Sequence, residues 1–176
     1  MKKIFYSLIS LVCLSACSSE NAVLDALRVD DVNTSTCKTA LSPTETRSDF
    51  YAANYGKPAI LNIDLGEDGT AQCLLEDVEA NCSVENILVN IANQDNQIDL
   101  IVYHKPLDAQ ANCICNFDVD FRISKLTPGK YILNVYYATP NLKYSESTMA
   151  YNGQIDLSQN KKVKVTLKPE IILPDN

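Results

Sequence analysis

The cysteines and the single histidine are the side chains of this 176-residue sequence that offer the most chemistry. Seven cysteines are present, and five lie beyond the first 20 residues: Cys37, Cys73, Cys82, Cys113 and Cys115. Cys113 and Cys115 are two residues apart in a segment that alternates apolar and polar residues like a β-strand. On a strand their side chains share one face and are too far apart to bond to each other, so each should reach a cysteine on another segment.

A metal site is one possible use of these residues. If the loop 105–112 closes symmetrically, His104 lies opposite Cys113, and Cys82 lies just before the strand that pairs with His104. Thiolates and imidazole are the ligands that zinc prefers, which makes Cys82, His104, Cys113 and Cys115 a candidate zinc site. The spacing matches no recognised zinc motif, however, and in an oxidising compartment disulfides are the favoured alternative. We therefore predict no metal and no other cofactor.

Catalytic motifs are missing from the sequence. No Gly-x-Ser-x-Gly elbow, P-loop or Gly-x-Gly-x-x-Gly is present. Asp118 and Asp120 could work as an acid–base pair, but they lie on the polar side of one predicted strand, where a solvated surface is the simpler interpretation. We predict no catalytic residue. The formal net charge of −7 also argues against nucleic acid as a partner, because phosphate affinity comes from Lys and Arg.

The N-terminus has the parts of a secretory signal. Lys2 and Lys3 precede an uncharged stretch, 4–16, that is too short to span a membrane. The stretch ends in Leu14-Ser15-Ala16-Cys17, which resembles the lipobox of bacterial lipoproteins. The resemblance implies that residues 1–16 are a signal peptide and that Cys17 carries a lipid. The protein would then be anchored in the outer membrane, facing either the periplasm or the cell surface.

The rest of the chain divides into three parts. Residues 17–56 are expected to form a tether and an irregular N-terminal segment, with a short helical turn near 22–29. Period-two alternation begins after Lys57 and predicts a β-sandwich domain over 57–168. Residues 169–176 are expected to be a C-terminal tail.

Turn signals within 57–168 predict a series of hairpins. The expected pairs are 59–65 with a strand through Cys73 and Leu75, 87–91 with 98–102 about a turn at Gln94 and Asp95, 113–124 with 131–137, and 149–157 with 163–167. This gives seven or eight strands and no long helix. The predicted fold is an all-β antiparallel sandwich, immunoglobulin-like or transthyretin-like.

Two stretches resemble known bacterial proteins. The string 126–135 resembles the L-x-P-G-x-Y strand entry of transthyretin-like and immunoglobulin-like bacterial sandwiches. The stretch from Asn81-Cys82 through 111–118 to 126–131 resembles a group of uncharacterised bacterial envelope lipoproteins. Those carry one Cys before a hairpin, a Cys-x-Cys entering the next strand and then a Gly-x-Tyr strand. No activity comes with this resemblance.

The resemblance and the strand geometry together suggest which cysteines bond. Cys73 lies inside a strand and outside the pattern of that group, so we expect it to stay reduced. The other four allow three pairings, and bonding of Cys113 to Cys115 is disfavoured by their common strand face. Cys37 and Cys82 should then each bond one member of the Cys-x-Cys.

The functional hypothesis is a lipid-anchored, non-catalytic module of the bacterial cell envelope that binds or supports another component. The expected partners are the membrane, through the lipid, and an envelope protein or a glycan. One alternative is a thiol-redox or zinc-binding envelope protein that uses the cysteine cluster. Another is an adhesion or fimbria-accessory sandwich, in which an exposed strand edge pairs with a partner.

Lipidation at Cys17 can be tested directly. Replacing Cys17 with Ala removes the acceptor thiol, so the variant should lose the acyl group. It should then be soluble, or remain uncleaved and held by its signal segment. Fractionation and intact-mass measurement read out both results. A variant that is still acylated and fractionates like the parent would disprove the lipoprotein hypothesis.

Overall fold

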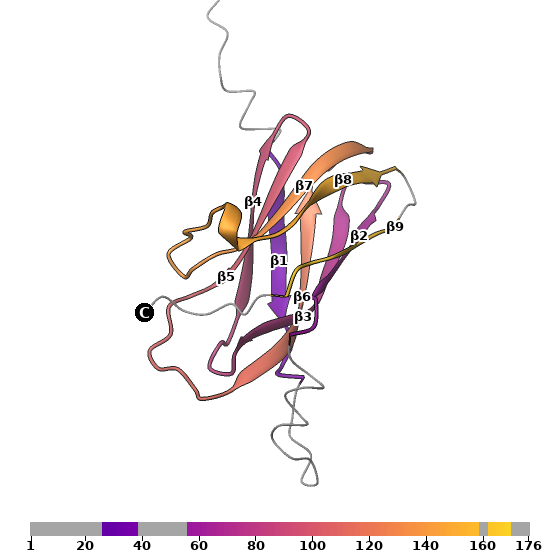
Figure 1. Ribbon diagram of the computed structural model, residues 1–176. Coiled ribbons are helices and arrows are strands. Elements are labelled where there is room, and N and C mark those ends of the chain that lie inside the picture. Colours follow the sequence, from indigo (N-terminus) through magenta and orange to yellow (C-terminus); the bar gives the residue numbers. More distant parts are fainter. Residues whose placement is uncertain (1–25, 39–55, 159–161, 170–176) are drawn as a thin grey trace, which may run out of the picture.

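Alternating apolar and polar residues fold this chain into two β-sheets that stack face to face (Figure 1). The structure, a computed structural model, describes residues 26–38, 56–158 and 162–169. The five-stranded sheet contains, in spatial order, β1 (Arg28–Thr34), β6 (Ile114–Ser124), β3 (Ala71–Asn81), β2 (Ile60–Leu65) and β9 (Lys162–Thr166). The four-stranded sheet contains β4 (Ile87–Gln94), β5 (Gln97–His104), β7 (Gly129–Tyr137) and β8 (Met149–Leu157).

The predicted all-β sandwich is confirmed, with nine strands in the described ranges in place of seven or eight. All neighbouring strands run antiparallel except β5 and β7, which are parallel. The described helical structure is one short 3-10 turn, η1 (Glu146–Thr148), before β8. Within the same ranges, no helix is long and apolar enough to cross a membrane.

One apolar core lies between the sheets. Leu61 and Leu75 of the five-stranded sheet share it with Leu100 and Leu133 of the four-stranded sheet, and each is about 1% exposed. Burying a side chain of this size contributes about 1.5–3 kcal/mol relative to leaving it in water. The core therefore provides the main attraction that holds the two sheets together.

The predicted hairpin of β2 and β3 is present. Ile63 pairs with Cys73, and the chain reverses at Gly66–Gly69. Gly69 has φ +77°, a conformation that glycine adopts without strain, and the Asp68 side chain accepts a hydrogen bond from the Thr70 amide at 3.0 Å. The local turn residues explain why this hairpin could be read from the sequence.

The hairpin of β4 and β5 is present, but its predicted register was wrong. Gln94 pairs with Gln97, so the turn lies at Asp95 and Asn96. Asp95 has φ +51°, which an Asp side chain tolerates better than most. Ile91 consequently pairs with Leu100. Because the shift is two residues, the apolar faces of the two strands still coincide.

Two other predicted hairpins were wrong, because their strands belong to different sheets. Strand β6 pairs with β1 and β3, whereas β7 pairs with β5 and β8. Leu126, 1% exposed, follows β6, and its amide donates to the Gly69 carbonyl at 2.9 Å, so the chain turns into the core and crosses to the other sheet. Strands β8 and β9 likewise separate, with β8 beside β7 and β9 beside β2. Alternation shows which face of a strand is buried but not which sheet it joins.

The N-terminal boundary of the sandwich also needs correction. Residues 28–34, expected within an irregular segment, form β1 on β6. A bulge between Asp30 and Asn33 interrupts the pairing, and Asp31 has φ +53°. The extra residue breaks the period-two pattern that would have marked the strand. The predicted signal peptide, Cys17 and most of the predicted C-terminal tail lie outside the described residues.

The two sheets are also hydrogen-bonded to each other at both sides. The Thr34 hydroxyl accepts from the Ile87 amide at 2.9 Å and donates to the Ile87 carbonyl at 3.1 Å, which joins β1 to β4. On the opposite side, the Lys168 amide donates to the Ala150 carbonyl at 2.9 Å. These contacts use backbone groups of Ile87 in β4 and Ala150 in β8, which are the edge strands of the four-stranded sheet. A partner strand that added to this sheet would need such groups to be free.

The alternation of β6 gives a stability prediction. Phe121 is 2% exposed, whereas its neighbour Asp120 is exposed. Phe121→Ala should lower the free energy of unfolding by roughly 3–5 kcal/mol, because it leaves a cavity in the core. Asp120→Ala should change it by no more than about 0.5 kcal/mol. Denaturant titration measures both, and equal losses would contradict the assignment of faces.

Candidate binding groove and cysteine cluster

Four cysteines form two disulfides at one end of the sandwich. Cys37 bonds to Cys115 and Cys82 bonds to Cys113, with Cα–Cα distances of 5.5 and 5.6 Å. The prediction that Cys37 and Cys82 each bond one member of the Cys-x-Cys is confirmed. Backbone hydrogen bonds support this placement, because the Cys82 amide donates to the Cys113 carbonyl at 3.2 Å. The bonds fasten the segment after β1 and the end of β3 to the start of β6.

Cys73 keeps a free thiol, as expected. It lies in β3 between Ile63 and Phe121, which are its partners on the two neighbouring strands, and it is 4% exposed. Burial raises the pKa of this thiol to about 12, because a thiolate would lose its hydration there. Cys73 therefore belongs to the core and has no nucleophilic role at neutral pH.

His104 does not face Cys113, contrary to the symmetric-loop hypothesis. It is completely buried at the end of β5, where its strand partner is Ile87. The loop after it carries the chain to β6 in the other sheet. Its Nδ1 lies 2.6 Å from the Lys105 carbonyl oxygen, so Nδ1 donates there, and Nε2 has no hydrogen-bond partner among the residues that the structure describes.

The candidate zinc site is therefore not assembled. Cys82, Cys113 and Cys115 are bonded in disulfides, so they offer no thiolate to a metal. Across residues 26–38, 56–158 and 162–169, no three His, Cys, Asp or Glu side chains are placed to hold a metal ion.

The carboxylates of Asp118 and Asp120, both in β6, lie in different environments. Asp118 accepts from the Lys38 ammonium at 2.7 Å and from the Asp77 amide at 3.1 Å, and Lys38 also contacts Asp77 at 2.6 Å. Burial lowers the pKa of Lys38, but the hydrogen bonds to Asp118 and Asp77 outweigh it, so the net shift is upward. Asp118 is thus part of an ion-pair clasp, and Asp120 lies apart from it in a groove.

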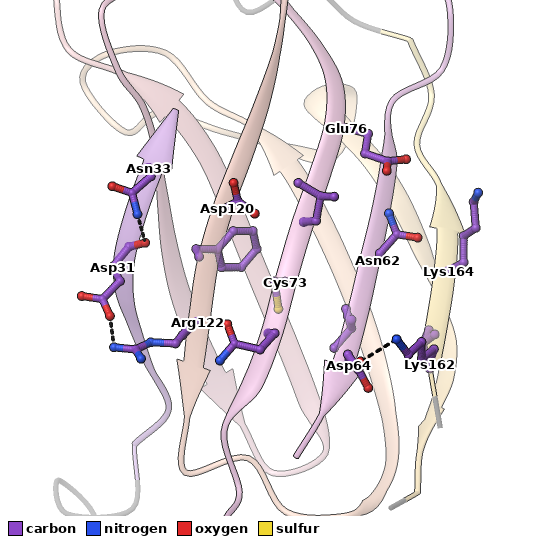
Figure 2. A pocket seen from close by; sticks show the side chains of 15 residues that line it. Asp31, Asn33, Asn62, Asp64, Cys73, Glu76, Asp120, Arg122, Lys162 and Lys164 are labelled. Atoms are coloured by element: carbon purple, nitrogen blue, oxygen red, sulfur yellow. Dashed lines mark hydrogen bonds and ion pairs between the residues drawn. The ribbon is translucent and has the colours of Figure 1, made fainter. Parts of the chain in front are cut away.

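That groove follows the outer side of the five-stranded sheet and has a volume of about 660 Å³ (Figure 2). The strand registers align one row of side chains across all five strands: Asn33, Asp120, Leu74, Asn62 and Lys164. A second row contains Arg122, Gln72, Asp64 and Lys162. Because both rows come from outward positions of paired strands, the groove has a polar lining on a rigid floor.

Ion pairs neutralise the second row. Arg122 pairs with Asp31 from the bulge of β1, and Lys162 lies 2.9 Å from Asp64 (Figure 2). In the first row and beside it, the side chains of Asn62, Glu76, Asp120 and Lys164 have no hydrogen bond or ion pair in the described part of the chain. Together with the Gln72 amide of the second row, which also has no partner among the described residues, these groups are available to a ligand.

Sequence reasoning missed this groove. The sequence pattern placed Asp120 on the polar side of one strand. Lys162 and Lys164 lie on β9, an edge strand of the five-stranded sheet. Only the spatial strand order brings them into one groove with Asn62 and Asp120, and no local signal carries that order.

Comparisons with protein-family models, with curated proteins and with solved structures found no match. The groove and the cysteine cluster must therefore be interpreted from their own geometry.

The burial of Cys73 gives a reactivity prediction. With a pKa near 12, its thiolate fraction at pH 8 is about one in 10⁴, and the surrounding core excludes reagents. Iodoacetamide should therefore leave Cys73 unmodified in the native protein and alkylate it fully in guanidinium chloride. Mass spectrometry of the Cys73 peptide measures this. Rapid native alkylation would show that Cys73 is not held in the core.

Proposed function

We propose that this protein is a lipid-anchored, non-catalytic module of the bacterial cell envelope that binds a glycan in the groove on its five-stranded sheet. The N-terminal basic pair, the uncharged stretch and the sequence Leu14-Ser15-Ala16-Cys17 support the anchor. The two disulfides suit an oxidising compartment outside the cytoplasm.

The observation that carries the binding proposal is the set of unpartnered side chains in the groove. The Asn62 amide can both donate and accept, the carboxylates of Glu76 and Asp120 accept, and the Lys164 ammonium donates. The vicinal hydroxyls of a sugar are donors and acceptors that match such a set. Leu74, half-buried between them, supplies a small apolar floor for the C–H face of a ring.

The charges of the lining favour a neutral or weakly charged glycan. Four carboxylates, of Asp31, Asp64, Glu76 and Asp120, stand against three cations, of Arg122, Lys162 and Lys164. Two of these cations are already paired with carboxylates. The positive and negative charges of the lining nearly cancel, and the whole protein has a formal net charge of −7. A strongly anionic polymer would therefore be attracted only weakly at long range.

A glycan array probed with the full chain in detergent tests the proposal, followed by calorimetry on the best oligosaccharide. Asn62→Ala and Asp120→Ala should each weaken binding by roughly ten-fold, because each removes a hydrogen-bonding group from the groove. Gln154→Ala is the matched control, since Gln154 is an exposed amide side chain on the other sheet. It should leave the affinity unchanged.

Thermal unfolding of each variant separates loss of binding from loss of fold. If no array glycan binds, or if the two groove variants bind as well as the control, the glycan-binding proposal is wrong.

A further inference from the structure

The two disulfides touch each other. Besides its bond to Cys37, Cys115 has its sulfur 3.2 Å from the sulfur of Cys82, which is bonded to Cys113. The four sulfurs thus form a continuous chain in the order Cys37, Cys115, Cys82 and Cys113. A thiolate on Cys115 would therefore lie in contact with the Cys82–Cys113 disulfide.

The members of this chain differ in their access to solvent. Cys37 is exposed, Cys82 and Cys113 are half-buried, and Cys115 is 3% exposed. Of the two residues in this bridge, Cys37 is the one open to solvent, so it is the point at which a small thiol would enter. Attack at the Cys37 sulfur also makes Cys115 the leaving group.

We propose that the four cysteines form a disulfide-exchange relay that accepts a low-molecular-weight thiol at Cys37. In the first step the external thiolate bonds to the Cys37 sulfur, the Cys37–Cys115 bond breaks, and the electron pair leaves on Cys115. In the second step the Cys115 thiolate bonds to Cys82, the Cys82–Cys113 bond breaks, and Cys113 leaves as a thiolate that takes up a proton. The number of disulfides is unchanged, so no oxidant is needed.

Burial gives the relay its direction. A thiolate confined at Cys115 is deprived of water, which makes it costly and at the same time strongly nucleophilic. Transfer of the bond to Cys82 moves the charge to Cys113, which is more exposed and precedes the first residue of β6. The end state carries the external thiol on Cys37 and keeps β3 joined to β6 through Cys82 and Cys115. The segment after β1 then keeps its hydrogen bonds and its ion pair to β6 but is no longer joined to it by a disulfide.

A pair of serine variants of the full chain tests the contact between the two bridges. Cys113→Ser leaves Cys82 as a thiol beside Cys115, so Cys82 should displace Cys37 and transfer the free thiol to the exposed position. Cys82→Ser leaves the free thiol on Cys113, which is roughly 7 Å along an extended strand from Cys115 and should not exchange. After alkylation, cleavage on the carboxyl side of acidic residues places Cys37 and Cys82 in separate peptides, 32–45 and 80–85.

Mass spectrometry of these peptides should find roughly ten-fold more alkylated Cys37 in Cys113→Ser than in Cys82→Ser. Peptide 80–85 should be linked to peptide 109–118 through Cys115. If Cys113→Ser carries its label on Cys82 and keeps the Cys37–Cys115 bond, the relay is wrong.

Treatment of the unaltered protein with L-cysteine gives a second measurement that does not depend on a variant folding. The expected products are cysteinylated Cys37, alkylated Cys113 and a bond between Cys82 and Cys115, and fragmentation of peptide 109–118 locates the label. Alkylated Cys115 with an intact Cys82–Cys113 bond would overturn the proposal. Absence of any cysteinylated Cys37 would overturn it as well.

Discussion

Burial of the inner face of β6 is the interaction on which the rest of this structure depends. Four large side chains of that face are at most 3% exposed: Phe117, Val119, Phe121 and Ile123. Since successive side chains of a strand point to opposite sides, this burial forces the intervening residues outward. They are Asp118 in the ion-pair clasp, and Asp120 and Arg122 in the groove. The same register sets Cys115 against the end of β3, so the core determines the position of the cysteine cluster too.

Features fixed within a few residues could be predicted, and features fixed by distant contacts could not. The β2–β3 hairpin follows from Gly66 and Gly69, and the exclusion of a Cys113–Cys115 bond follows from their spacing on one strand. The assignment of β7 to the other sheet depends on Leu126 packing into the core, which alternation alone does not show. The groove depends in addition on strand order, because its lining comes from five strands spread between β1 and β9.

Two neighbouring residues attach the segment after β1 by different chemistry. Lys38 holds Asp77 and Asp118 through an ion pair whose ammonium side chain is 38% exposed, and exposed pairs contribute at most about 1 kcal/mol. The Cys37 disulfide closes a loop across 78 residues, and cross-links typically contribute 2–4 kcal/mol. Of these two attachments the covalent bond is the stronger, while the ion pair and the backbone hydrogen bonds of Ser35 and Lys38 to β6 fix the position of the segment on the sheet.

If Cys17 carries the proposed lipid, the early start of β1 limits the distance between the sandwich and the membrane. Arg28 follows Cys17 by eleven residues, and an extended chain of that length reaches ~40 Å at most. A tether that continued to residue 57 would have allowed ~140 Å. With a lipid on Cys17, the groove would sample a thin layer next to the bilayer. A ligand held in that layer would meet the protein at a raised effective concentration, so that modest intrinsic affinity would suffice for occupancy.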